Sequence, residues 1–166
     1  MSTIEEKANR FPAFVEKMAR RCASEHESSV VAGMEAHQGF HLAITANTDF
    51  APLVAAWMAA TGRARYACIV SGCPQWRDFQ FERVRQYLLP LWVGEKQKAL
   101  YLEDAKIDFL VQRAVLKGSR YKDTRPDLLI IDETVSLISE TDKCWFLYDL
   151  VRATSSTARI LEVRDR

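Results

Sequence analysis

The chain alternates short apolar runs with longer stretches of helical periodicity. After Gly39 there are five apolar runs of strand length, at residues 40–45, 66–70, 99–102, 128–131 and 159–163. After each of the first four runs, apolar residues recur every three or four positions, as in a helix, at residues 50–61, 75–91, 105–116 and 139–152. Strands that alternate with helices of this length are typical of βα units, which build a mainly parallel sheet.

The N-terminal segment, residues 3–35, has apolar residues on one helical face and charged residues on the other. Pro12 is expected to break this segment, because proline cannot donate a hydrogen bond inside a helix, and polar residues 24–29 to break it again. We therefore predict an N-terminal helical extension at residues 1–38 and one α/β domain at residues 39–166. The domain should have three layers, with about five strands and helices on both faces of the sheet.

Glycine and proline mark the expected ends of these elements. Gly62, Gly94 and Gly118 each stand just past a predicted helix, where a left-handed conformation favours glycine. Pro126 precedes the fourth apolar run, a place where a strand tolerates a missing donor. These positions support the division into strands and helices.

Composition and charge narrow the class of protein. With 166 residues, of which 48% are hydrophobic and 27% charged, the chain can bury one ordinary core. The formal net charge is +1, so nucleic-acid binding would require a local basic patch. No apolar run approaches the roughly 20 residues of a membrane-spanning helix, and residues 1–21 lack the apolar core of a secretory signal. We therefore expect a cytoplasmic protein with no membrane partner.

The four cysteines do not indicate a disulfide framework or a zinc module. Cys22, Cys68, Cys73 and Cys144 lack the paired spacing of either, and buried thiols are the expectation. Cys73 follows a predicted strand, where a thiolate nucleophile is conceivable. However, every histidine precedes residue 42, so no base is placed beside it.

Four acidic residues follow two of the predicted strands. Glu103 and Asp104 come after the third strand, and Asp132 and Glu133 after the fourth. Ligands bind beyond the carboxyl ends of parallel strands, so Glu103, Asp104 and Asp132 could bind Mg²⁺ if the two strands are neighbours. The alternative, which we favour for Glu103 and Asp104, is that they only stabilise the N-terminus of the next helix.

The fourth strand and its acidic end resemble a known motif. The run Pro126-Asp127-Leu128-Leu129-Ile130-Ile131-Asp132-Glu133 is similar to the Walker B strand of P-loop NTPases, especially helicases and related nucleic-acid motors. The resemblance implies that Asp132 binds Mg²⁺, that Glu133 polarises the attacking water, and that ATP is the cofactor. Two looser similarities accompany it: the strand–helix pair beginning at residue 40, and residues 154–158, which resemble a Ser/Thr/Ala-rich coupling motif.

The chain departs from that family at the phosphate-binding loop. It contains no Gly-x-x-x-x-Gly-Lys-Ser/Thr, the loop that cradles the phosphates, and Lys117-Gly118-Ser119 reverses the order of Gly and Lys. The resemblance therefore implies a degenerate ATPase-like domain. We expect an accessory or regulatory component of nucleic-acid processing, not an autonomous ATPase.

A basic loop before the acidic strand is the candidate contact for DNA or RNA phosphates. It contains Lys117, Arg120, Lys122 and Arg125. A second basic and aromatic stretch, residues 76–87, is interpreted more simply as an amphipathic helix that packs its aromatic residues inward.

Two other functions remain open. The first is a non-enzymatic module that regulates or inhibits another protein through its N-terminal helix and exposed aromatics such as Trp57, Trp92 or Trp145. The second is a Mg²⁺-dependent enzyme that uses the strand-end carboxylates. Residues 99–104, with Asp132 on a later strand, also resemble the acidic pocket of response-regulator receiver domains, but the strand and helix expected between them are missing.

Overall fold

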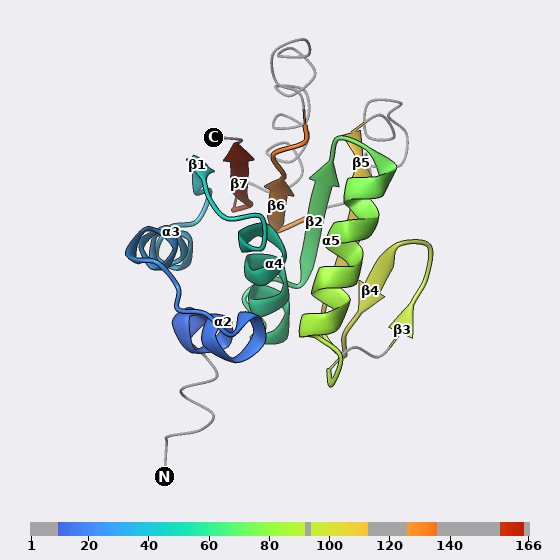
Figure 1. The fold of residues 1–166 in the computed structure, drawn as a ribbon, viewed down its shortest axis with the longest axis horizontal. Coiled ribbons are helices and arrows are strands. Elements are labelled where there is room, and N and C mark those ends of the chain that lie inside the picture. The colour runs from blue at the N-terminus through green and yellow to red at the C-terminus, as the bar shows by residue number, and fades with distance from the viewer. Residues whose placement is uncertain (1–9, 92–93, 113–125, 136–156, 165–166) are drawn as a thin grey trace.

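The computed structural model describes residues 10–91, 94–112, 126–135 and 157–164, which form a seven-stranded sheet with helices packed against it (Figure 1). The helices are α2 (Phe11–Ala19), α3 (Glu25–Ala36), α4 (Phe50–Ala60) and α5 (Pro74–Tyr87). The strands are β1 (His41–Thr45), β2 (Tyr66–Ser71), β3 (Gly94–Glu95), β4 (Ala99–Tyr101), β5 (Lys106–Val111), β6 (Leu128–Ile131) and β7 (Arg159–Arg164).

The sheet is mainly parallel, as predicted, and has more strands than expected. Its order is β1-β7-β6-β2-β5-β4-β3. From β1 to β5 all neighbouring strands are parallel, whereas β4 and β3 form an antiparallel hairpin at one edge. Because β1, β7, β6 and β2 are parallel neighbours, the carboxyl ends of β1, β6 and β7 lie at the same end of the sheet.

Alternate residues of the central strands face two different cores. Ile69 of β2 and Ile130 of β6 pack in the core that contains α4 and α5, which lie in front of the sheet in Figure 1. Val70 and Ile131 belong to a second core on the opposite face. The helix predicted at residues 139–152 lies outside the described residues.

Helix α4 is the most deeply buried helix of the described chain. Its sequence, Phe-Ala-Pro-Leu-Val-Ala-Ala-Trp-Met-Ala-Ala, has no charged residue, and all but its last residue are buried. Trp57 is 1% exposed and stacks under the Arg63 guanidinium at 4.2 Å. The expectation that Trp57 is an exposed partner-binding residue was therefore wrong, because it belongs to the core. Trp92 and Trp145 lie outside the described residues.

The two N-terminal helices share their core with α4. Phe14 of α2 and Met34 of α3 are buried in it. Pro12 does not break a helix, because it lies in the first turn of α2, where the missing N–H has no partner to lose. Ser24 is the N-cap of α3 and forms a reciprocal capping box with Glu27. The polar stretch 24–29 therefore starts a helix and does not interrupt one.

One predicted helix, at residues 105–116, was wrong. Residues 106–111 form β5 instead, and β5 pairs with β2 and β4. Its sequence alternates as a strand does, since Ile107 and Phe109 are buried on the α5 side while Asp108 is only partly buried. Gly94 begins β3 and caps no helix, whereas Gly62, with a φ of 73°, follows α4 as expected.

In the described part of the chain, no helix combines the length and apolar character that crossing a membrane requires.

Candidate functional site

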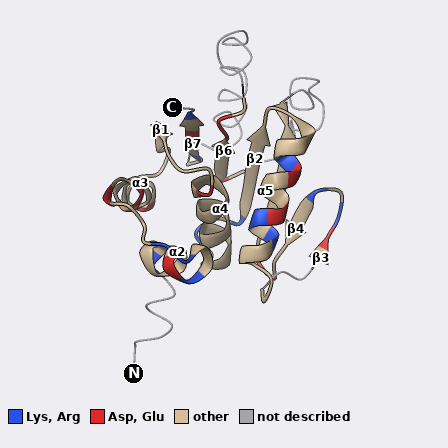
Figure 2. Ribbon diagram, in the orientation of Figure 1, with Lys and Arg blue, Asp and Glu red and all other residues tan. Residues whose placement is uncertain are grey.

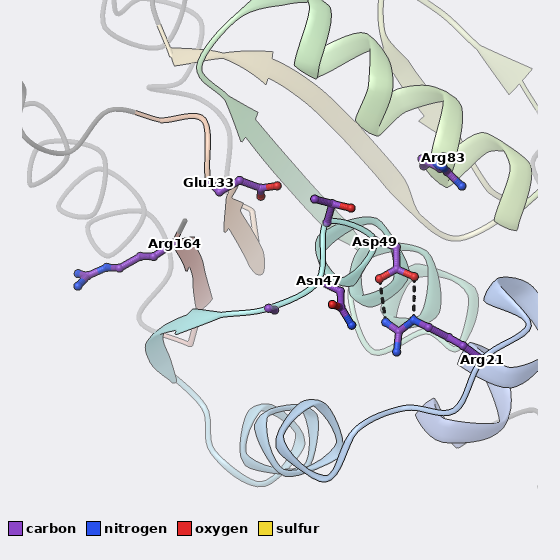
Figure 3. A pocket seen from close by; sticks show the side chains of 8 residues that line it. Arg21, Asn47, Asp49, Arg83, Glu133 and Arg164 are labelled. Carbon is purple, nitrogen blue, oxygen red and sulfur yellow. Dashed lines mark hydrogen bonds and ion pairs between the residues drawn. The ribbon is translucent and has the colours of Figure 1, made fainter. Parts of the chain in front are cut away.

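A pocket of about 600 Å³ opens at the edge where β1, β6 and β7 end. It is lined by the loop 46–49, which joins β1 to α4, and by Arg21, Arg83, Glu133 and Arg164. In Figure 3, Glu133 points toward this loop, whereas Arg164 extends away at the end of β7. Ligands of parallel sheets bind beyond the carboxyl ends of the strands, and this pocket occupies that position.

The loop between β1 and α4 is short and contains neither glycine nor lysine. Only Ala46, Asn47, Thr48 and Asp49 separate the two elements. The Phe50 N–H donates to the Asn47 carbonyl at 3.0 Å, which closes the turn. A phosphate-binding loop needs a longer Gly-rich segment whose N–H groups surround the phosphate, and a lysine at its end. This loop therefore forms no such cradle.

A carboxylate of the chain itself lies at the N-terminus of α4. Asp49 is the N-cap residue but makes no capping hydrogen bond through its side chain. Instead it accepts two hydrogen bonds from Arg21, at 2.9 Å from Nε and 2.8 Å from Nη2 (Figure 3). The positive end of a helix dipole favours an anion. Asp49 supplies that anion from within the chain.

Arg21 uses all five of its N–H groups. Besides Asp49, it donates to Glu27 at 2.8 and 2.7 Å and to the Cys22 carbonyl at 3.0 Å. A guanidinium has five donors, so Arg21 has none left for a ligand in this conformation. It joins the turn after α2, the start of α3 and the start of α4.

Glu27 is 2% exposed, and Arg21 stabilises the charged form of its carboxylate. Burial alone would raise its pKa, but hydrogen bonds from Arg21 and from the Ser24 amide lower the pKa below its usual value. Because the folded-state pKa is lowered, Glu27 stabilises the fold above the unfolded pKa and loses that contribution as the pH falls through the folded pKa.

We expect the free energy of unfolding to decrease on acidification below about pH 4.3, the ordinary pKa of a glutamate. Urea titrations across the acid range should show a smaller decrease for Glu27→Gln than for the wild type. The exposed residue Glu16 provides the matched control, Glu16→Gln. Equal acid dependence in Glu27→Gln and Glu16→Gln would contradict this assignment.

Asp132 is 1% exposed, and its carboxylate accepts four hydrogen bonds. Oδ2 accepts from Ser71 Oγ at 2.5 Å and from Gln80 Nε2 at 3.3 Å. Oδ1 accepts from the Thr134 amide at 2.9 Å and from the Thr134 hydroxyl at 2.5 Å. Asp132 thus ties the end of β6 to the end of β2 and to α5. A cation could bind this carboxylate only if some of these donors moved.

Burial raises the pKa of Asp132, although the hydrogen bonds from Ser71, Thr134 and Gln80 oppose the shift. Because the pKa of Asp132 is higher in the folded than in the unfolded state, its contribution to stability is fully present below the unfolded-state pKa. That contribution is lost as the pH rises through the folded-state pKa. On acidification the contribution of Asp132 to stability therefore changes in the opposite direction to that of Glu27. Only a variant of Glu27 itself can isolate the contribution of Glu27.

The structure separates the predicted acidic residues. Glu103 and Asp104 lie in the turn between β4 and β5, and the neighbouring Tyr101 pairs with Lys106 at the start of β5. Because β4 runs antiparallel, this turn lies at the sheet edge opposite to Asp132 and Glu133. The shared Mg²⁺ site of Glu103, Asp104 and Asp132 is therefore not assembled. Among the described residues, no three His, Cys, Asp or Glu side chains cluster as metal ligands would.

Other parts of the predicted site lie outside the described residues. These are Lys117, Arg120, Lys122 and Arg125 of the basic loop, and residues 154–156 of the Ser/Thr/Ala-rich run. Conversely, sequence reasoning missed Arg21, Asp49 and Arg83. The capping box beginning at Ser24 was a visible signal for Glu27, but nothing in the sequence linked Glu27 to Arg21 and Asp49.

Comparison with known proteins finds similarity in fold only. No family model and no curated protein matches the sequence. The large terminase of bacteriophage HK97 has a TM-score of 0.69 at 13% identity, over 95% of this chain and 37% of that chain. The large terminase ATPase domain of Thermus phage P74-26 has a TM-score of 0.56 at 13% identity, over 92% and 68%.

A third similar structure is the Sulfolobus solfataricus SWI2/SNF2 ATPase core in complex with dsDNA. Its TM-score is 0.54 at 15% identity, over 96% of this chain and 33% of that chain. The chain thus shares its fold with these structures, and it spans little more than a third of the length of the HK97 terminase.

Proposed function

We propose that this chain is a degenerate ATPase-like domain, an accessory or regulatory component of nucleic-acid processing that does not hydrolyse ATP on its own. The observation that carries the proposal is the loop before α4. It has no Gly or Lys, and its Asp49 carboxylate, paired with Arg21, lies where a phosphate would have to approach the helix N-terminus. A bound phosphate would meet a like charge there.

The acidic strand end supports the same proposal. Both carboxylate oxygens of Asp132 accept hydrogen bonds from Ser71, Gln80 and Thr134. These contacts favour a structural role for Asp132 over Mg²⁺ binding. Glu133 and Arg83 line the pocket and are the side chains that Mg²⁺ and a nucleotide would meet. We propose that Mg²⁺ with ATP binds in this pocket without turnover, with its phosphates beside Arg83 and not at the N-terminus of α4.

The names of the similar structures support the proposed role in nucleic-acid processing. These structures include the N-terminal domain of the DNA packaging ATPase from bacteriophage phi29, with a TM-score of 0.52 at 11% identity over 76% of this chain and 73% of that chain. The SWI2/SNF2 core was solved with dsDNA.

An interaction module remains the second candidate, for a specific reason. Leu89 and Leu91, after α5, are 63% and 53% exposed. Two exposed leucines so close in the sequence would suit a protein–protein contact. The Mg²⁺-dependent enzyme is not supported, because its carboxylates lie at opposite edges of the sheet.

Hydrolysis and binding test the first proposal separately. With ATP and Mg²⁺, the wild type should release phosphate no faster than Glu133→Gln. Calorimetry should still detect nucleotide binding, weakened about tenfold in Arg83→Ala through loss of a charge-assisted contact. Arg77→Ala, on the same helix and paired with Asp78, is the control. Turnover that disappears in Glu133→Gln and persists in Glu16→Gln would show an autonomous ATPase and refute the proposal.

A further inference from the structure

A second hollow lies next to the 600 Å³ pocket, and some residues line both of them. It has a volume of about 290 Å³ and lies between the end of α2 and the last turns of α5. Lys17 and Arg20 line it from the α2 side, and Gln86 from the α5 side. Asp49 and Arg83 line both this hollow and the larger pocket. The two hollows therefore adjoin at Asp49 and Arg83, and together they make up the groove of Lys17, Arg20 and Arg83.

The groove carries positive charge that the described chain does not neutralise. Asp49 is the one acidic residue that lines the smaller hollow, and it is already paired with Arg21. Within the described residues, no carboxylate lies within 4.0 Å of the charged nitrogens of Lys17, Arg20 or Arg83. Lys and Arg residues mark both α2 and α5 in Figure 2. The dipole of α2 favours cations in its last turn, but it does not explain Arg83 on the opposite wall.

A stack of flat side chains runs along α5 toward this groove. The Trp76 and Phe79 rings are stacked, with centroids 4.9 Å apart and an interplanar angle of 22°. The Arg83 guanidinium lies over the Phe79 ring at 5.3 Å. Trp76 and Phe79 are both partly exposed. Residues 76, 79 and 83 follow helical spacing, so they share one side of α5.

We propose that the groove of Lys17, Arg20 and Arg83 binds the phosphodiester backbone of single-stranded nucleic acid, whose bases stack against Trp76 at the end of the Arg83–Phe79–Trp76 stack. This inference rests on the proposed role in nucleic-acid processing and names the strand and the surface involved. A cationic groove beside aromatic side chains is the combination with which proteins bind single strands, because every base has a π face.

The shape of the groove favours one strand over a duplex. Proteins read duplex DNA by inserting a helix or a β-ribbon into its grooves, which requires a protruding element. Here the cations line a hollow between two helices, into which a single sugar-phosphate chain can enter. Arg83 lies at the junction of the two hollows, so the strand would pass beside the nucleotide pocket.

Fluorescence anisotropy of labelled oligo(dT), titrated with the full chain at several salt concentrations, tests the backbone contact. Each phosphate contact to a single strand contributes about 0.7 to the slope of log K against log salt. The double variant Lys17→Gln/Arg20→Gln should therefore reduce that slope by about 1.4. Both residues are exposed, so the fold should tolerate the change. Arg10→Gln/Lys96→Gln removes the same charge from exposed positions outside the groove and is the control.

The stacking contact has its own variant. Trp76→Leu should weaken oligo(dT) binding about tenfold, whereas Tyr101→Leu, which removes an exposed ring elsewhere, should not. Equal salt slopes for the groove variant and its control would overturn the proposal. So would equal affinity for a duplex of the same length, or a groove variant that weakens Mg²⁺-ATP binding and spares oligo(dT). None of these readouts depends on ATP turnover, so the two proposals can fail independently.

Discussion

Arg21→Ala should lower the free energy of unfolding by about 3 kcal/mol, the low end of the range for breaking a buried ion pair. The low end applies because the Arg21 side chain is itself 25% exposed, whereas that of Glu27 is only 3% exposed. Removal of the guanidinium leaves the Glu27 carboxylate buried with the Ser24 amide as its remaining donor. The substitution also removes the side chain that joins α2 and α3 to the start of α4. Urea unfolding followed by circular dichroism measures the change.

Two further variants identify the cause of that loss. Arg10→Ala removes an exposed arginine and should change stability by less than about 0.5 kcal/mol. Adding Glu27→Gln to Arg21→Ala should restore part of the lost stability, because the unpaired charge is gone. The pH dependence should also weaken. Without Arg21, only the hydrogen bonds from Ser24 oppose the effect of burial on the pKa of Glu27, so acidification should cost Arg21→Ala less stability than it costs the wild type. An Arg21→Ala protein as stable as Arg10→Ala would refute the ion-pair argument.

Gly72→Ala should destabilise the fold by about 3 kcal/mol or more, as a severe overpacking does. A Cβ at this position would lie 2.6 Å from the Thr134 carbonyl carbon and closer still to its oxygen. Both are backbone atoms, so no side chain can rotate away. The loops after β2 and β6 would have to separate. That movement would stretch the hydrogen bond from the Gly72 amide to Thr134 Oγ1, now 2.7 Å, and disturb the donors around Asp132.

Gly94→Ala is the matched control, because no atom lies within 4 Å of a Cβ placed there. It should change stability by less than about 0.5 kcal/mol. Superimposable unfolding curves for Gly72→Ala and Gly94→Ala would contradict the close approach of the two loops. A Gly72→Ala protein that unfolds at lower denaturant, with Gly94→Ala unchanged, would support it.

The strands were predictable from sequence because their burial leaves a simple signal. Leu128 to Ile131 are buried on both faces of the sheet, and an uninterrupted apolar run is what such a strand requires. The error at β5 has a physical reason too. Its Ile107 and Phe109 face the core while Lys106 and Asp108 do not. In so short a segment, two buried residues fit a strand and a helix alike.

The site was less predictable, because its contacts join residues far apart in the chain. The acidic strand end pointed to Glu133, which lines the pocket. It could not reveal that the Asp132 carboxylate is engaged by Ser71 and Gln80. Likewise, Glu103 and Asp104 remained candidates for a site with Asp132 because the hairpin that reverses β4 carries no strong turn signal. The direction of each strand determines which acidic residues lie close together, and the periodicity of apolar residues does not predict that direction.

The position of β7 has a consequence for how the protein is made. Residues 159–164 fill the space between β1 and β6, so among the described strands β1 has no partner in the sheet until they have left the ribosome. Until then the nascent chain exposes the edges of β1 and β6, which can pair with other chains. We expect newly synthesised molecules to depend on chaperones during this interval. Contacts between strands so distant in sequence also make folding slow, because a long loop must close before they form.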